Sequence, residues 1–470
     1  MVFSSNLFIF AFVPIFFSIY YLLPYRARNP FIFLASIFFY EFGAGPIVLV
    51  LIGSIIFNYA AGRAIEATAG RRGLSGAVFW LAVAVNVAVL VYYKYAGFLW
   101  GAANDLTGGA LSAHGLPRPD VVLPIGISFF TFQALSYIAD IHTGHCRSAR
   151  SLLEFGMYHS LFPQLIAGPI VRYAEIRGEI LKRYVSMAMV SDGFARFALG
   201  LGKKIIIADH AGAIADAVFK LAPDQLSPGV AWLGAIAYSI QILFDFSGYS
   251  DMAIGLGLLL GFHFPENFNH PYRSQSVTEF WRRWHMTLSR WFRDYLYIPL
   301  GGNRKGPYRT YANLVLVFFL CGLWHGAGYT FVIWGLYHGL LLMTERFALH
   351  RWNLAPRGFA GQAYTLLMVV VGWVFFRSTS LPHAAALLQQ MSLLGEHGGD
   401  RPSLVSFLAA DQASYLAVGI VLALVPVIGL LPQRSALVLA ARRLASLVMF
   451  VYSAALLSAN TFNPFLYFRF

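Results

Sequence analysis

The chain has 470 residues, of which 58% are hydrophobic, 16% aromatic and only 12% charged, and its mean hydropathy is +0.63. Soluble domains carry roughly 25% charged residues, so this composition excludes a soluble protein. The net charge of +13 does not indicate nucleic-acid binding, because the basic residues lie in loops between apolar segments, where they orient membrane helices. We therefore expect a polytopic membrane protein.

The apolar segments predict an all-α fold, because a helix of about 20 apolar residues crosses the hydrocarbon core. Candidate spans are 6–23, 30–43, 45–62, 76–101, 123–141, 152–171, 228–261, 311–325, 328–348, 361–377, 414–431 and 440–459, with 194–220 as a weaker one. Pro163 and Gly168-Pro169 interrupt 152–171, so this segment is a candidate re-entrant one. We expect about ten to twelve spans plus partial ones.

Charges in the loops predict the orientation of the first helices. The connections 24–30, 62–75 and 142–151 hold arginines, whereas 102–122 has no basic excess. Positive loops face the cytoplasm, so we expect the N-terminus outside. The first apolar stretch has no positive flank and no small-residue cleavage site, so it is interpreted as a retained helix. Neither a soluble domain nor a repeat is found, which predicts one membrane domain over 1–470.

The longest polar stretch of the second half is 263–310, with eight basic residues against three acidic ones. Aromatic and aliphatic residues recur there at helical spacing, with arginines between them: Phe280, Trp281, Trp284, Leu288, Trp291, Tyr295 and Ile298. This pattern predicts a basic amphipathic helix that lies in the membrane interface. The charge rule places it on the cytoplasmic side.

Leu323-Trp324-His325-Gly326 is the most informative polar feature inside an apolar segment, because ionisable residues are costly in a membrane. If the span begins near Tyr311, His325 lies 14 residues further on, about 21 Å deep at about 1.5 Å per residue. Glycines directly after it break the helix, which favours a cavity. A histidine bonded to a neighbouring helix backbone is the alternative to a proton-transfer group.

Two further histidines are candidates. His285 follows Trp284 on the amphipathic segment; it is either a residue of the amphipathic face or a second functional histidine. His338 lies 13 residues after His325 and either lines a cavity or packs between helices.

A polar insertion interrupts the span 228–261, with Asp245, Tyr249 and Asp251 among its residues. The two carboxylates either pair with arginines of the following helix or line a passage. Gln133 marks another polar point, in the span 123–141.

Several stretches together carry a family resemblance: LPIGISFFTFQ (123–133), FPQLIAGPIVR (162–172), NFNHPY (267–272), DYLYIPLGGNR (294–304), LWHGA (323–327) and FLYFRF (465–470). The chain resembles the membrane-bound O-acyltransferase family, and within it the membrane proteins of bacterial alginate O-acetylation. The resemblance runs nearly end to end. It implies a ring of helices around a central funnel, into which an acyl thioester enters from one side and a hydroxyl acceptor from the other.

In this family the signature histidine matches His325, and a second polar marker matches His285, so the resemblance implies that both are catalytic. We infer that His325 is the general base, which takes the proton of the acceptor hydroxyl as it attacks the carbonyl of acetyl-CoA. Acetyl-CoA is then a donor substrate, and neither a bound cofactor nor a metal is expected. Candidate tunnel-lining residues are Trp324, Asp245, Tyr249, Asp251, Gln133 and His338. Candidate ligands of the CoA phosphates are Arg282, Arg283 and Arg290, whose alternative role is to anchor anionic lipid.

The resemblance also implies a location and partners. Acetyl groups would cross the bacterial inner membrane to periplasmic acetyltransferase- or acetylesterase-like proteins that modify an exopolysaccharide, alginate or a similar polymer. One alternative is a related enzyme that passes D-alanine to teichoic acids. Another is a membrane conduit without chemistry, which would tolerate His325→Ala better than an acyltransferase.

Overall fold

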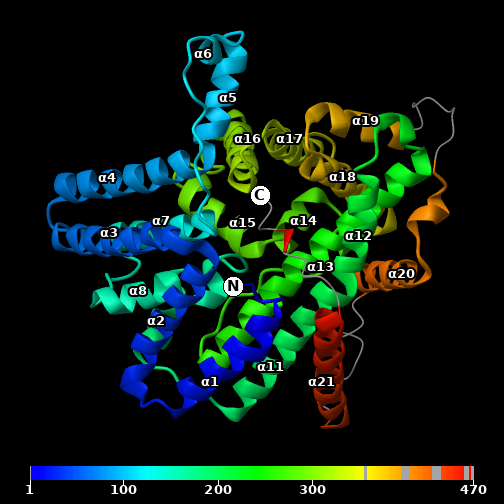
Figure 1. The fold of residues 1–470 in the computed structure, drawn as a ribbon. Coiled ribbons are helices and arrows are strands. Elements are labelled where there is room, and N and C mark those ends of the chain that lie inside the picture. The colour runs from blue at the N-terminus through cyan, green and yellow to red at the C-terminus, as the bar shows by residue number, and fades with distance from the viewer. Residues whose placement is uncertain (1, 354–356, 393–401, 426–435, 460–464, 467–470) are drawn as a thin grey trace. The chain divides into compact units, whose positions relative to one another are not determined.

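The computed structural model describes residues 2–353, 357–392, 402–425, 436–459 and 465–466 (Figure 1). Every regular element within these ranges is a helix and none is a strand, so the predicted all-α class is confirmed. The chain divides into two compact units. Unit 1 comprises Met1–Val190 and Leu256–Pro265, and unit 2 comprises Ser191–Gly255 and Glu266–Phe470. The single domain over 1–470 stays a prediction.

Unit 1 is built around α3. Its elements are η1 (Phe8–Phe12), α1 (Val13–Leu22), α2 (Tyr25–Ala44), η2 (Gly45–Ile47), α3 (Val48–Ala67), α4 (Arg72–Leu90), η3 (Val91–Tyr95), α5 (Ala96–Leu106), α6 (Ala110–Ala113), α7 (Ile127–His142), α8 (Leu152–Ser160), α9 (Phe162–Leu165) and α10 (Tyr173–Leu181). Helix α3 packs against α4, α7 and α8. Asn58 and Asn86 exchange two amide hydrogen bonds of 3.1 and 2.8 Å between α3 and α4, so their buried polar groups are satisfied.

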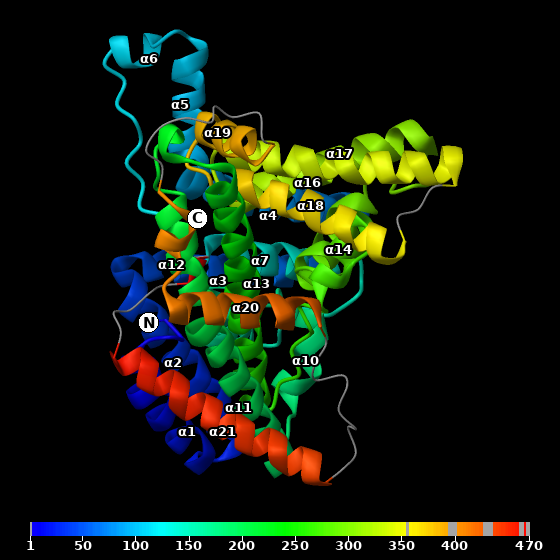
Figure 2. The same ribbon diagram turned by 90° about the vertical axis from the view of Figure 1, so that its right-hand side faces the viewer.

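Unit 2 holds most of the second half of the chain. Its elements are α11 (Met187–Gly202), which begins in unit 1, η4 (Lys203–Ala208), α12 (Asp209–Val218), η5 (Pro223–Gln225), α13 (Pro228–Leu260), which ends in unit 1, η6 (Pro271–Arg273), α14 (Val277–Arg283), α15 (Met286–Phe292), η7 (Arg293–Tyr297), α16 (Gly306–His325), α17 (Tyr329–Trp352), α18 (Gly358–Arg377), α19 (Leu381–Met391), η8 (Leu404–Phe407), α20 (Ala410–Leu424) and α21 (Ala436–Ala459). Successive helices α16, α17 and α18 lie side by side (Figure 2).

Five helical runs in the described ranges are long and apolar enough to cross a membrane: Tyr25–Ala67, Arg72–Leu106, Pro228–Leu260, Gly358–Arg377 and Ala440–Ala459. Two shorter apolar helices are Phe8–Leu22 and Ala410–Leu424. The predicted count of about ten to twelve spans is therefore not confirmed. The predicted interruption of 152–171 is present, since α8 ends at Ser160 and α9 is only four residues long.

The single amphipathic helix predicted within 263–310 is wrong. The structure has two short helices, α14 and α15, with a break at Trp284 and His285. In a continuous helix the Met286 N–H would bond four residues back; here it donates to the backbone carbonyl of Asn267 at 2.9 Å. The aromatic face is also buried, with Phe280 fully inaccessible and Trp284 only 2% exposed. A neighbouring loop segment therefore competes successfully with the helical hydrogen bonds.

Glycines bring α11 and α13 together in unit 2. A Cβ atom on Gly200 would lie 2.5 Å from the carbonyl oxygen of Gly248 and 2.7 Å from the Met252 nitrogen. Such a contact is possible only without side chains at the crossing, as at the small-residue interfaces of membrane helices. The close approach places Lys203 and Lys204, which follow α11, beside the carboxylates of α13.

Candidate active site

Helix α16 ends at His325. Gly326 takes an extended conformation, and α17 begins three residues later, after the cap residue Gly328. The predicted helix break after His325 is therefore confirmed. The His325 side chain is buried, with 5% exposure.

The crossing of α16 and α17 also depends on glycine. A Cβ atom on Gly322 would collide with the carbonyl oxygen of Phe331, and one on Gly335 with that of Phe318. The two helices therefore pack backbone to backbone directly beside the end of α16. This contact brings Trp334 of α17 against His325, with ring centroids 5.0 Å apart.

An aromatic cage surrounds His325. Its ring lies 4.9 Å from that of Trp324, 5.0 Å from Trp334 and 5.2 Å from Phe376, in edge-on arrangements. His325 also lines a cavity of about 20 Å³, together with Ile242, Asp245, Phe246, Trp284, Trp373, Phe376 and Leu466. Such a volume holds about one water molecule, so a larger group enters only when lining side chains move.

His285 contacts the same cluster from the break between α14 and α15. Its ring centroid lies 4.7 Å from that of Phe246 and 5.9 Å from that of Trp324. The residue is fully buried and has a left-handed backbone, with φ of 42°. Its Nδ1 atom lies 3.0 Å from Asn267 Oδ1. Burial lowers the pKa of His285 to about 3, so the ring is neutral at pH 7.

The Nε2 atom of His285 is buried and has no hydrogen-bond partner among the residues that the structure describes. Leaving a buried polar atom unsatisfied costs about 1–3 kcal/mol. Unpaired groups of this kind call for an explanation, such as a strained or catalytic role. The site thus combines a caged histidine at a cavity with a second, neutral histidine.

Asp245 lines the cavity, but its charge is compensated. Its Oδ1 lies 2.8 Å from Lys204 Nζ, and its Oδ2 accepts the Leu466 N–H at 2.9 Å. Lys204 is also 2.8 Å from Asp209, and it is only 1% exposed. These three charges form an ion cluster at the edge of the cavity, in which Lys204 and Asp245 are buried and Asp209 is half-buried.

Tyr249 and Asp251 do not line this cavity. Asp251 is ion-paired with Arg196 and Lys203, both at 2.6 Å, and the Tyr249 ring lies 5.0 Å from that of Phe465. Of the two alternatives for the carboxylates of α13, pairing with arginines of the following helix is wrong, whereas Asp245 does lie at the cavity. Their partners come from the preceding α11 and η4, because the glycine contact brings those elements against α13.

The remaining predicted residues lie as follows. His338 packs within unit 2, where Trp281 Nε1 donates to its Nδ1 at 3.3 Å, and it is not among the residues that line the cavity. Gln133 is fully buried in α7 of unit 1. Arg282 is exposed, Arg290 is half-buried, and Arg283 is paired with Glu279 at 2.7 Å. Binding of the CoA phosphates by these three arginines stays a prediction.

Asn267 and Lys204 are two residues of the site that were not predicted as site residues from the sequence. Asn267 accepts from His285 and Thr287 in the segment between Pro265 and Pro271. Prolines at both ends of a polar run favour an extended segment, whose side chains then need partners; this was the available signal. Lys204 lies in an apolar stretch, where a single lysine already requires a partner.

Comparison with known proteins identifies the family. The profile of the membrane-bound O-acyltransferase (MBOAT) family matches residues 120–382. Over its whole length the chain is 41% identical to the whole of a protein from Pseudomonas putida named probable alginate O-acetylase AlgI. It is 37% identical to a peptidoglycan O-acetyltransferase from Helicobacter pylori, over 83% of this chain and 80% of that protein. A teichoic acid D-alanyltransferase from Bacillus subtilis is 28% identical, over 54% of this chain and 67% of that protein. With its apolar helices, the chain is a multi-pass membrane enzyme, an O-acyltransferase that belongs to the membrane-bound O-acyltransferase family.

Proposed function

We propose that this enzyme transfers acetyl groups from cytoplasmic acetyl-CoA, across the bacterial inner membrane, for O-acetylation of an exopolysaccharide such as alginate. The observation that carries the proposal is the position of His325, a buried histidine at a helix end that lines a cavity. The match to a probable alginate O-acetylase over the whole of both chains supports the choice of acetate and alginate.

In the proposed mechanism His325 is the general base. It takes the proton of the acceptor hydroxyl while the hydroxyl oxygen attacks the thioester carbonyl of acetyl-CoA. The new C–O bond forms, the C–S bond breaks, and the proton on His325 passes to the CoA thiolate. Both substrates react directly, so no covalent enzyme intermediate is needed.

The proposal extends to location and partners. The N-terminus faces the periplasm, since the arginine-containing loops 24–30, 62–75 and 142–151 face the cytoplasm. Arg282, Arg283 and Arg290 attract the CoA phosphates on the cytoplasmic side. Periplasmic acetyltransferase- or acetylesterase-like proteins receive the group and deliver it to the polysaccharide.

The test is acetyl content of the exopolysaccharide in a deletion strain complemented with wild type, His325→Ala or His285→Ala at equal membrane abundance. We expect the wild type to restore acetylation and His325→Ala to abolish it. His145→Ala is the matched control, because His145 is exposed and we expect it to behave as wild type. Full acetylation with His325→Ala would refute the role of His325 as general base and would favour a membrane conduit without chemistry.

Transfer of D-alanine is the second candidate, because the relative from Bacillus subtilis is named a teichoic acid D-alanyltransferase. Membrane vesicles that contain the enzyme, its periplasmic partner proteins and the polymer are incubated with radiolabelled acetyl-CoA or with a carrier protein loaded with radiolabelled D-alanine. We expect label in the polymer fraction from acetyl-CoA alone. Label from the D-alanyl carrier alone would replace acetate by D-alanine as the transferred group.

A further inference from the structure

The carboxamide of Asn267 has one orientation in the structure. Its oxygen, Oδ1, accepts from the Thr287 backbone N–H at 3.3 Å and from the Thr287 hydroxyl at 2.9 Å. Its nitrogen donates to Ser250 Oγ at 3.0 Å. Because a backbone N–H can only donate, the atom that faces Thr287 must be the carbonyl oxygen. The same oxygen faces Nδ1 of His285.

This orientation determines the tautomer of His285. A carbonyl oxygen only accepts, so Nδ1 of His285 must hold the proton. A neutral imidazole with its proton on Nδ1 leaves a lone pair on Nε2. That Nε2 is the buried atom without a hydrogen-bond partner in the described part of the chain. His285 therefore offers a hydrogen-bond acceptor on a ring whose centroid lies 4.7 Å from that of Phe246; Phe246 lines the cavity, and His285 itself does not.

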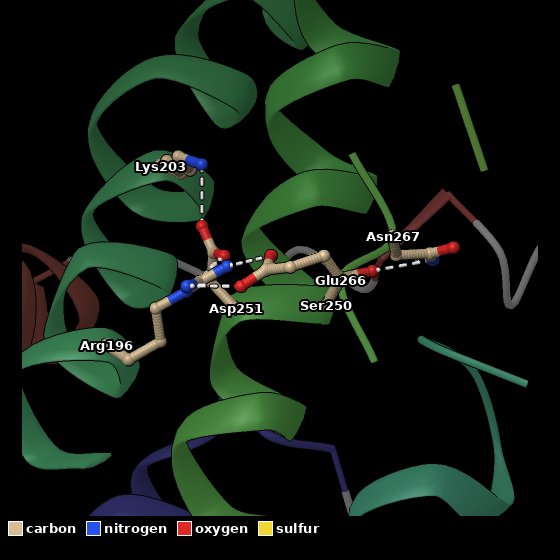
Figure 3. Close-up of polar contacts among 6 residues, drawn as sticks. All are labelled: Arg196, Lys203, Ser250, Asp251, Glu266 and Asn267. Carbon is tan, nitrogen blue, oxygen red and sulfur yellow. Dashed lines mark hydrogen bonds and ion pairs between the residues drawn. The ribbon is translucent and has the colours of Figure 1, made fainter. Parts of the chain in front are cut away.

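An ion network fixes the segment that holds Asn267 (Figure 3). Arg196 binds both carboxylate oxygens of the adjacent Glu266, at 2.9 and 2.6 Å. The same guanidinium binds Asp251 at 2.6 Å, and Lys203 binds the other oxygen of Asp251 at 2.6 Å. Glu266 and Asn267 are thus tied to the neighbouring residues Asp251 and Ser250 of α13. The bidentate geometry favours a defined position over a loose contact.

We propose that Asn267 is a positioning residue that holds His285 as the Nδ1–H tautomer, so that its Nε2 accepts a hydrogen bond from an N–H or O–H group of a substrate. This inference rests on the proposed function for the identity of that substrate. The donor group belongs either to the pantetheine amides of acetyl-CoA or to the acceptor polymer. His325 keeps the role of base, because the bond to His285 involves a substrate hydrogen other than the one that is transferred.

The carboxylates on the elements around His285 are all paired with basic side chains. On α13, Asp245 is paired with Lys204, and Asp251 with Lys203 and Arg196. Beside Asn267, Glu266 is paired with Arg196. On α14, Glu279 is paired with Arg283. The other titratable and charged groups on these elements are Tyr238 and Tyr249 on α13, Arg282 on α14, Arg290 on α15, and Tyr308, Arg309, Tyr311, Cys321 and His325 on α16. The tautomer therefore depends on the Asn267 carboxamide and not on a bare neighbouring charge.

The first arm of the test reads the tautomer without any activity. Histidine labelled with ¹⁵N is incorporated into the full-length protein in lipid, and the His285 signals are identified by subtracting the spectrum of His285→Gln. We expect a protonated Nδ1 and a bare Nε2 in the wild type, and a mixture of tautomers in Asn267→Leu. A protonated Nε2 in the wild type would overturn the inference, whether or not the enzyme transfers acetyl groups.

The second arm measures acetyl transfer from acetyl-CoA in membrane vesicles. Asn267→Leu keeps the side-chain size but removes the acceptor oxygen, so we expect a loss of about 10- to 100-fold, as for residues that orient a metal-ligating histidine. A rise in KM for acetyl-CoA assigns the hydrogen-bond donor to the pantetheine, and a fall in kcat alone assigns it to the acceptor. Wild-type kinetics in Asn267→Leu would overturn the positioning role.

Two variants separate positioning from folding. Ser250→Ala removes the bond to the Asn267 nitrogen and leaves Oδ1 on His285, so we expect activity within about threefold of wild type. Asn267→Asp keeps an acceptor oxygen for His285 and should retain more activity than Asn267→Leu. A role in stability alone predicts the reverse order, because a buried carboxylate costs more than a buried leucine.

Discussion

The buried ion pair between Lys204 and Asp245 leads to a quantitative prediction for the variant Lys204→Met. Lys204 Nζ lies 2.8 Å from Asp245, and their side chains are 1% and 3% exposed. Two unit charges at that distance attract by about 6 kcal/mol at an effective dielectric constant of about 20. Removing one partner of such a pair costs about 3–5 kcal/mol, because the other charge stays buried and uncompensated. We expect a loss of this size in the free energy of unfolding.

Unfolding in mixed micelles with increasing SDS, followed by tryptophan fluorescence, measures this loss. Lys203→Met is the matched control: Lys203 is 24% exposed, and its partner Asp251 keeps Arg196, so we expect less than about 1 kcal/mol. Adding Asp245→Asn to Lys204→Met removes the buried stranded charge, leaves only the half-buried Asp209, and should recover at least about 1 kcal/mol. Equal losses for both lysine variants, or a double variant less stable than Lys204→Met, would refute the reasoning.

Two further predictions concern packing and pH. Gly322→Ala places a Cβ against the Phe331 carbonyl and should lower the free energy of unfolding by about 1–3 kcal/mol in the same assay. The control is Gly53→Ala, whose Cβ meets nothing within 4 Å and which should be neutral or stabilising. Equal effects of the two variants would contradict the close crossing of α16 and α17. The lowered pKa of His285 means that the unfolded chain binds more protons between about pH 6.5 and pH 3, so stability is lost as the pH falls. From pH 7 to pH 5 the wild type should lose about 2 kcal/mol more than His285→Gln, and parallel stability curves would show that His285 is not buried as described.

Local signals in the sequence were sufficient to predict where α16 ends. Glycine directly after His325, and again two residues later, cannot continue a helix favourably, and the structure ends the helix there. The break in 152–171 was predictable for a similar reason, since Pro163 and Gly168-Pro169 are local interruptions. The all-α class followed from the apolar segments alone.

The break between α14 and α15 had no such signal. Trp284 and His285 are compatible with a helix, and the aromatic spacing continues across them. The break depends on Asn267, whose backbone carbonyl accepts a hydrogen bond from the Met286 N–H and whose side chain is hydrogen-bonded to His285. Competition from a segment 18 residues away is a tertiary effect, which periodicity does not contain.

The partners of the α13 carboxylates could also not be predicted from the sequence. Composition showed that carboxylates in an apolar helix need partners, but several basic residues were available before and after α13. The choice of Lys203 and Lys204 depends on the Gly200–Gly248 contact. Which glycines mark helix crossings cannot be read from a chain with 43 of them.

The small cavity beside His325 has a consequence for wasted turnover. An activated acyl group that meets water is hydrolysed, and a histidine base can activate water as readily as a sugar hydroxyl. The cavity has room for about one water, at about 20 Å³, and its walls are mostly aromatic and aliphatic. An acyl group that enters therefore displaces the water that could attack it. Under the proposed mechanism, the partition between transfer and hydrolysis is therefore set by space: the acceptor enters as the next occupant of the cavity, and an enzyme without acceptor does not hydrolyse its donor.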